Sequence, residues 1–498
     1  MATVAPRAEG GTGRQITAFF KESAVYGVGL GVSKFSSLLI LPILTATLTP
    51  ADLGVLTLLQ VFGAVLAIFL NAGVQQAINR NYYDENTDEH RAAVVGTGLL
   101  WRLILTGVLA GGLALAALPM TRAVLGEATH LHVIYYLFTL ANVAIMAPQG
   151  IAYTLYRVRR QAVRNTAFSV SGVTISFVML VWLLWWRERG IRGALEAAVL
   201  ATAAMTLAML PDLLRSAKLR LRKDVLRGIL SYGLPFLPHH LAVYLLFGAD
   251  RYFLQYYRGA TEVGLYSYGY RIAMIMTLVL DGASMAWTPF IFSIQHRQDA
   301  KEIHALTARY ILALIVGTAA GLCLFAAELV RLLALHSPEY WKAASVTTWI
   351  IVGQVFLGVY QVFGAAVGIP KRTRLYPVFS GSGLVANLLL NWLLVPRYGM
   401  MGAAVATLIS YAVMGLLALG ITQRVYPLPY EWGRLFVLAL AASVCVAAGS
   451  MIPQMGLWPT LLAKLGCLML FPLILLTMGF LNERERARLR ELVSQFRP

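Results

Sequence analysis

The sequence consists mainly of long apolar stretches that are separated by short polar segments. Five of the stretches contain no Asp, Glu, Lys or Arg: residues 53–79, 128–156, 343–370, 398–423 and 435–463. Each is longer than the roughly 20 residues with which a helix crosses the hydrocarbon of a bilayer. Spanning strands would alternate apolar and polar residues, whereas these stretches are apolar on every face. The pattern therefore predicts membrane-spanning helices.

The whole pattern predicts an all-α polytopic membrane protein with about 14 transmembrane helices. A first set is expected near residues 24–48, 53–78, 93–118, 130–156, 165–186, 193–212 and 229–250. A second set is expected near residues 262–290, 310–327, 343–369, 375–395, 400–420, 435–452 and 458–481. The even number places both termini on the same side of the membrane.

Composition agrees with this class, because 58% of the residues are hydrophobic, only 13% are charged and the mean hydropathy is +0.68. Soluble domains carry about 25% charged residues, so a water-soluble fold is excluded. Cys323, Cys445 and Cys467 all lie in apolar segments, which predicts small core residues rather than a disulfide framework or a metal site. We expect no catalytic cluster, no metal and no cofactor.

Lysine and arginine are distributed unevenly between the two sides of the predicted membrane. Of the 41 such residues, 28 fall in segments on the side of the termini and 9 in the loops on the other side. Positively charged loops are retained in the cytoplasm, so both termini are predicted to be cytoplasmic. The net charge of +18 then reflects orientation and contact with anionic membrane lipids, and it requires no nucleic-acid partner.

Three short patterns recur about 210 residues apart. They are an acid–aliphatic–glycine–aliphatic pattern at 52–55 and 262–265, Trp-Leu-Leu at 182–184 and 392–394, and Gly-x-x-Gly-Ala at 190–194 and 399–403. The offset contains six predicted helices, so helices 1–6 and 7–12 are predicted to form two bundles related by a pseudo-two-fold axis. The predicted helices 13 and 14 then follow the two bundles as additional helices. This architecture is typical of transporters.

The expected organisation has six parts. They are a cytoplasmic N-terminal segment (1–22), an N-terminal six-helix bundle (23–214), a basic cytoplasmic linker (215–228), a C-terminal six-helix bundle (229–422), helices 13 and 14 (423–482) and a cytoplasmic C-terminal tail (483–498).

Several motifs carry a resemblance to a known family. They include Ser-Tyr-Gly-Leu-Pro at 231–235, Asp-Arg-Tyr-Phe-Leu at 250–254, Trp-Thr-Pro-Phe at 287–290, and a block from Tyr340-Trp341 through Asn391-Trp392 to Gly402-Ala403-Ala404. With these motifs the chain resembles the Wzx-like oligosaccharide flippases of bacterial polysaccharide biosynthesis. That family belongs to the multidrug/oligosaccharidyl-lipid/polysaccharide exporter superfamily, and the resemblance covers most of the chain.

The resemblance implies a substrate, a direction and a location. The substrate is an oligosaccharide repeat unit on a polyprenyl diphosphate such as undecaprenyl diphosphate. Alternating access would move it from the inner to the outer leaflet of the bacterial cytoplasmic (inner) membrane, for exopolysaccharide or O-antigen type assembly. A polysaccharide polymerase and glycosyltransferases of the same pathway are expected partners. Coupling to a proton or sodium gradient stays open.

Cations inside the predicted spans are candidate ligands for the diphosphate, because charge in a span is costly and usually functional. Lys34 lies about 15 Å into the first predicted helix at 1.5 Å per residue, near mid-membrane, and Arg271 lies similarly deep in the eighth. We predict that both bind the diphosphate, one from each bundle; the alternative is a structural ion pair, for example with Asp281. Arg80, at the inner end of helix 2, is predicted to guide the phosphates or to act as a positive-inside anchor.

Other polar residues in the spans suggest gating and coupling. Asp250 and Arg251, predicted at the outer end of helix 7, are expected to gate through a salt bridge to the other bundle or to cap their helix locally. His239 and His240 follow Pro235 and Pro238 in a helix that must kink there. These histidines suit proton coupling or a polar cavity lining. Asp281 is the expected ion or proton site.

Six amide side chains in the spans are candidate sugar contacts, with helix-to-helix hydrogen bonding as the alternative. They are Asn142, Gln149, Gln354, Gln361, Asn387 and Asn391.

Three other functions compete with this interpretation. A multidrug extruder would require an acidic cavity, whereas the mid-membrane charges are two cations against one acid. The function of a lipid II flippase is not excluded by the spacing of these residues. A membrane glycosyltransferase or polymerase would need carboxylates at an acceptor site, and the only acidic cluster (84–89) lies in a short turn, so we do not expect an enzyme.

Overall fold

The computed structural model describes residues 31–32, 34–36, 38–85, 87–453, 456–482 and 485. These residues form helices and connecting turns, and no strand occurs among them. The predicted N-terminal segment 1–22 and, apart from Glu485, the predicted tail 483–498 lie outside the described residues. The chain divides into two compact units, of which the first ends at Tyr244 and the second begins at Leu245.

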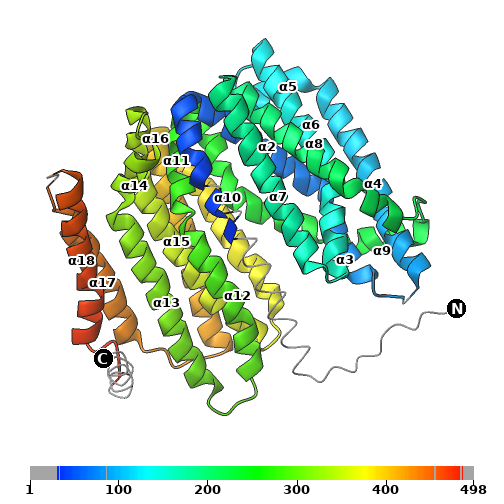
Figure 1. The fold of residues 1–498 in the computed structure, drawn as a ribbon. Coiled ribbons are helices and arrows are strands. Elements are labelled where there is room, and N and C mark those ends of the chain that lie inside the picture. The colour runs from blue at the N-terminus through cyan, green and yellow to red at the C-terminus, as the bar shows by residue number, and fades with distance from the viewer. Residues whose placement is uncertain are drawn as a thin grey trace, which may run out of the picture. The chain divides into compact units, whose positions relative to one another are not determined.

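The first unit is built from helices that lie side by side (Figure 1). They are Lys34–Thr47, α2 (Pro50–Asn71), α3 (Val74–Asn81), α4 (Asp88–Leu115), α5 (Ala117–Leu125), α6 (His130–Val158), α7 (Ala162–Val181) with a π-helical end at Trp182–Trp186, α8 (Gly190–Ser216) and α9 (Lys223–Gly233). Its core lies between α3, α4, α6 and α9, where Val74, Ile78, Leu99, Ile151 and Ile229 are buried. Helix α10 (Phe236–Arg258) crosses from the first unit into the second.

The second unit continues with helices of the same kind. They are α11 (Ala260–Ala273), α12 (Met276–Ile294), α13 (Ala300–Leu324), α14 (Ala326–Leu333), a 3-10 turn at Pro338–Ala343, α15 (Ala344–Ala365), α16 (Tyr376–Val425), α17 (Trp432–Ser450) and α18 (Leu457–Thr477). Its core is rich in aromatic residues, because Tyr266, Tyr268, Tyr340, Phe379 and Tyr411 are all fully buried.

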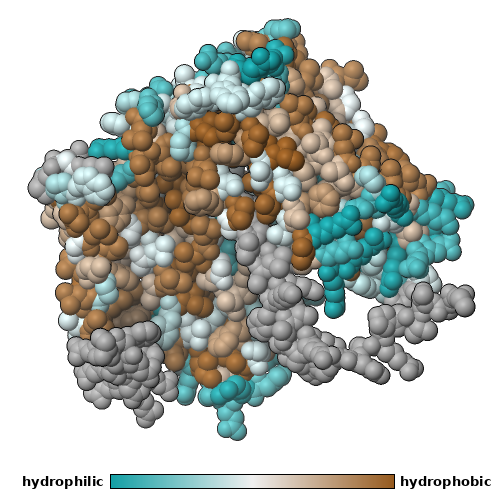
Figure 2. Space-filling model, in the orientation of Figure 1, coloured by the Kyte–Doolittle hydropathy of each residue, from teal (hydrophilic) through white to brown (hydrophobic). Residues whose placement is uncertain are grey.

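The prediction of an all-α polytopic membrane protein is confirmed. Eleven described helices are long and apolar enough to span a membrane, and a twelfth span is the pair α9 and α10, which bends by 42° next to Pro235 as expected. Two further segments bring the helices close to the predicted number: α16 has 50 residues and breaks at Gly399, and Lys34–Thr47 is a shorter apolar helix. Figure 2 shows apolar side chains along the flanks of the helices and hydrophilic ones at their ends.

Two features of the fold recur at the spacing found in the sequence. Gly190, where α8 begins, and Gly399, where α16 breaks, are 209 positions apart and have φ of 54° and 55°. The short helix α5 follows α4 just as α14 follows α13, and their first residues, Ala117 and Ala326, are separated by the same number of positions. The left-handed backbone at both glycines explains why the Gly-x-x-Gly-Ala pattern recurs, since residues with a Cβ avoid it.

Within the second unit, ion pairs connect α17, α18 and the residues next to them to α13 and α14. Lys464 Nζ in α18 lies 2.6 Å from Glu328 Oε1 in α14 and 2.9 Å from the Leu324 carbonyl oxygen. The buried Arg309 of α13 pairs with Glu431, just before α17, and with Glu485. Removing one member of a buried ion pair is strongly destabilising, so these three ion pairs hold the added helices in position.

Gly399→Ala is expected to destabilise the protein by about 1–3 kcal/mol, because alanine is strained at positive φ. The added Cβ would also lie 2.2 Å from Glu262 Oε2, which accepts a hydrogen bond from the Met400 amide at 2.8 Å. Thermal unfolding of purified protein measures the change. Gly420→Ala in the same helix is the control, since a Cβ there meets no atom within 4 Å; equal melting temperatures of the two variants would contradict the prediction.

Candidate functional site

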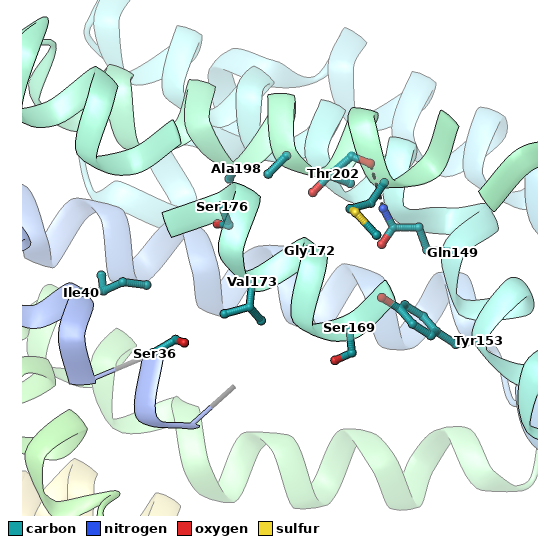
Figure 3. A pocket seen from close by; sticks show the side chains of 12 residues that line it. Ser36, Ile40, Gln149, Tyr153, Ser169, Gly172, Val173, Ser176, Ala198 and Thr202 are labelled. Carbon is teal, nitrogen blue, oxygen red and sulfur yellow. Dashed lines mark hydrogen bonds between the residues drawn. The ribbon is translucent and has the colours of Figure 1, made fainter. Parts of the chain in front are cut away.

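A pocket of ≈ 420 Å³ lies inside the first unit, between the first described helix, α6, α7 and α8 (Figure 3). Ligand-binding pockets commonly have volumes of about 300–1,000 Å³. We call it the α7 pocket, and it is lined by Ser36, Ile40, Gln149, Tyr153, Ser169, Gly172, Val173, Ser176, Ala198, Ala201, Thr202 and Met205.

The spacing of small residues along α7 produces this space. Ser169, Gly172, Val173 and Ser176 follow one another at intervals of three, one and three, which places them on one face of a helix. Figure 3 shows Gln149 and Tyr153 of α6, Ala198 and Thr202 of α8, and Ser36 of the first described helix around this part of α7. A Cβ on Gly172 would already contact Met205 Cγ at 3.4 Å, so any longer side chain at this position would enter the pocket.

Gln149 connects α6 to α8 at the edge of the α7 pocket. Its Nε2 donates to the Thr202 carbonyl oxygen at 2.8 Å and to Thr206 Oγ1 at 2.9 Å. Figure 3 shows its side-chain oxygen on the opposite side, directed into the space beside α7. Gln149 therefore ties two helices together and still presents an acceptor to the pocket.

Polar residues at one end of the first unit form a second group. Gln76 Nε2 lies 2.9 Å from His240 Nε2, and Asn71 Nδ2 donates to Gln76 Oε1 at 3.3 Å. The Arg80 guanidinium stacks over the Tyr232 ring at 4.9 Å. The predicted residues Arg80 and His240 thus belong to contacts that join α3 with α9 and α10. His239, the neighbour of His240, is exposed.

Arg102 of α4 is a buried cation that sequence reasoning left unassigned. Only 4% of the residue is exposed, and Nε and Nη1 make no hydrogen bond to the described part of the chain. The side chain lies beside Gly150, where a Cβ would come within 2.6 Å of Nη1 and 2.2 Å of Gln75 Nε2. The sequence already shows that Arg102 is a positive charge in a membrane-spanning helix. It does not show that Arg102 lacks a carboxylate partner among the described residues.

Asp250 and Arg251 form the centre of a buried network in the second unit. Arg251 Nη1 donates to Asp250 Oδ1 at 2.6 Å and to the Phe247 carbonyl oxygen at 2.5 Å, and the exposed fractions of Asp250 and Arg251 are only 1% and 5%. Tyr266 donates its hydroxyl to the other Asp250 oxygen, and the Tyr270 ring lies 4.1 Å below the guanidinium. The expected position at a solvated helix end is wrong: α10 continues to Arg258, so the pair lies two turns inside the helix.

Asn387 and Asn391 lie on one face of α16 and are fully buried. Asn391 Nδ2 donates to Asn387 Oδ1 at 3.0 Å and to its carbonyl oxygen at 2.9 Å. Asn387 Nδ2 and Asn391 Oδ1 make no hydrogen bond to the residues that the structure describes. Half of the hydrogen-bonding capacity of this pair is therefore unused in this conformation.

The remaining predicted residues lie on several different helices. Gln354 is buried in α15 with its Nε2 3.7 Å from Met274 Sδ, and Gln361 is half-buried in the same helix. Asn142 is half-buried in α6, Lys34 is half-buried in the first described helix, and Arg271 is half-buried in α11. Asp281 is exposed on α12. Their predicted roles stay predictions.

Comparison with known proteins places these residues in a wider context. Residues 19–295 match the protein family described as "Polysaccharide biosynthesis protein", and residues 235–393 match the family described as MatE. Over 212 residues the chain is 26% identical to the "Probable flippase AglR" of Haloferax volcanii. That alignment covers 41% of this chain and 42% of the relative.

Solved structures show the same fold. The structure titled "Lipid II flippase MurJ, inward closed conformation" matches 91% of this chain and 98% of its own with a TM-score of 0.74 and 13% identity. The inward-facing conformation of a multidrug resistance MATE family transporter matches 80% of this chain and 97% of its own with a TM-score of 0.66 and 17% identity. At these identities the similarity concerns the fold alone.

Proposed function

Since the chain belongs to the polysaccharide biosynthesis protein family, whose match covers residues 19–295, we propose that it is a flippase for lipid-linked oligosaccharides. The substrate would be an oligosaccharide repeat unit on a polyprenyl diphosphate such as undecaprenyl diphosphate. The protein would move it from the inner to the outer leaflet of the bacterial cytoplasmic membrane by alternating access, with both termini in the cytoplasm.

The match over more than half of the chain carries this proposal, and two further observations support it. A relative with 26% identity is named a probable flippase. The α7 pocket is lined by both hydroxyl-bearing and apolar side chains, and none of the described residues that line it is charged. An extruder of cationic drugs would need a carboxylate at its site, so a multidrug substrate is the weaker alternative. A lipid II flippase remains a rival, because its substrate is also a lipid-linked diphosphate sugar.

Specific residues are proposed for the parts of this substrate. Lys34 and Arg271 are cations of apolar helices and are proposed ligands for the diphosphate, with Arg80 as a guide. Asp281 is proposed as an ion or proton site, because an exposed carboxylate in an apolar helix is costly unless it is used. A polysaccharide polymerase and glycosyltransferases of the same pathway are proposed partners that consume and supply the substrate.

Flipping of a fluorescent lipid-diphosphate oligosaccharide in proteoliposomes tests the proposal. Wild type is expected to expose the label to an added quencher, and Lys34→Ala and Arg271→Ala are expected to lose this activity. Lys371→Ala, which removes a cation from the turn between α15 and α16, is the matched control and should retain it. Pyranine-filled vesicles and a sodium gradient identify any coupling ion.

Each outcome has a distinct meaning. Loss of flipping in both span variants supports a diphosphate site that includes these cations. Full activity in both would reject that assignment and leave the flippase proposal standing. Wild-type protein that is folded and moves none of the lipid-linked glycans offered would contradict the proposed function itself.

A further inference from the structure

The α7 pocket contains hydrogen-bonding groups that have no partner in the part of the chain that the structure describes. The hydroxyls of Tyr153, Ser169, Ser176 and Thr202 make no hydrogen bond to any residue within the described ranges. In contrast, Ser36 at the edge of the pocket donates to the Val32 carbonyl oxygen at 2.8 Å. All four residues are half-buried. Their hydroxyls are therefore available to a ligand that enters the pocket.

The chemistry of the lining selects the class of ligand. Hydroxyl groups both donate and accept, so they pair best with other hydroxyl or amide groups. A phosphate would require cations and a cationic ligand would require carboxylates, yet the described lining has neither. Tyr153 and Met205 add an apolar surface against which the C–H face of a sugar ring can pack.

We propose that the α7 pocket binds a neutral sugar unit of the lipid-linked glycan within the first unit, separately from the groups that hold the diphosphate. The inference rests on the proposed function for the identity of the glycan. The hydroxyls of Tyr153, Ser169 and Ser176, which have no partner among the described residues, and the Gln149 oxygen present four hydrogen-bonding groups to one space (Figure 3). Because Gly172 has no side chain, the pocket has room for a sugar ring.

Saturation-transfer NMR on the full chain in nanodiscs tests the proposal with glucose, galactose and N-acetylglucosamine as probes. We expect ring-proton signals from at least one sugar with wild-type protein. The triple variant Tyr153→Phe/Ser169→Ala/Ser176→Ala should weaken binding by at least about tenfold, because each lost hydrogen bond contributes about 1 kcal/mol. Gly172→Leu should abolish binding by filling the pocket, and excess inorganic pyrophosphate should not displace the sugar.

Thr174→Ala is the matched control, because it removes a hydroxyl from the same helix that is exposed and bonded to the Val170 carbonyl oxygen at 2.9 Å. Thermal unfolding verifies that every variant is folded. Equal sugar signals in wild type and the triple variant, displacement by pyrophosphate, or no signal with any of the three sugars would overturn the proposal. Sugar binding without flipping would reject only the proposed function, whereas flipping without sugar binding would reject only this site.

Discussion

Arg251→Ala is expected to lower the stability of the protein by about 3–5 kcal/mol, because removing one member of a buried ion pair leaves the other charge without compensation. Asp250 is 1% exposed, and within the described residues it would keep hydrogen bonds from the Tyr266 hydroxyl and from the backbone amide of position 251 alone. The guanidinium also packs against the Tyr266 and Tyr270 rings, so this contact area is lost as well. Chemical unfolding in mild detergent measures the change.

The double variant Asp250→Ala/Arg251→Ala separates the ion pair from the packing. It should be less destabilised than the two single variants together, since no unpaired charge remains. Arg297→Ala is the control, because Arg297 pairs with Asp299 at 2.8 Å in an exposed turn and exposed pairs contribute little. Additive effects in the double variant would show that the two charges are not coupled. The predicted gating role requires a further change in flipping rate that stability does not explain.

Arg102→Met is expected to raise stability by about 1–4 kcal/mol, the range seen when buried charged groups are replaced by apolar ones of similar volume. Arg102 is 4% exposed, and two of its guanidinium nitrogen atoms have no partner among the described residues. Because a cation that is costly in a span is usually retained for function, we expect the same variant to lose flipping activity. A rise in melting temperature together with a fall in transport would show that Arg102 serves flipping at a cost in stability.

Arg122→Met serves as the comparison, since Arg122 is exposed on the short helix α5. This variant should change neither the melting temperature nor the transport activity appreciably. A lower melting temperature for Arg102→Met would mean that Arg102 stabilises the unit through its packing against Gln75 and Gly150. Unchanged transport with raised stability would mean that the buried charge has no part in flipping.

The membrane-spanning character was predictable, because it depends on a property of the chain that needs no tertiary contacts. Every backbone group in a bilayer must be satisfied internally, so any apolar stretch of about 20 residues is helical whatever packs against it. The kink at Pro235 was predictable for the same local reason, since proline cannot donate to the preceding turn. The recurrence of Gly190 and Gly399 also followed from the sequence, although their left-handed backbone did not.

The candidate sites were only partly predictable. Gln149 was expected to contact a sugar or to tie helices together, and the structure places it between α6 and α8 at the edge of the α7 pocket. Ser169 and Ser176, which line the same pocket, were not singled out, because serine in an apolar helix usually serves in helix packing. Asp250 was expected in water, since the end of its helix was placed eight residues too early. An error of that size moves a charge from the membrane surface into the core.

By itself the sequence determined the helical class, the approximate spans, the internal repeat and the types of polar residue that the bilayer encloses, because these depend on hydropathy and on local backbone preferences. Only the tertiary structure decided that Asp250 and Arg251 are buried and paired with each other, while Arg102 has no carboxylate partner among the described residues. It also decided that four helices leave a pocket beside Gly172. The physical reason is that burial and pairing depend on which faces meet, and the faces that meet are set by the packing of all the helices of a unit together.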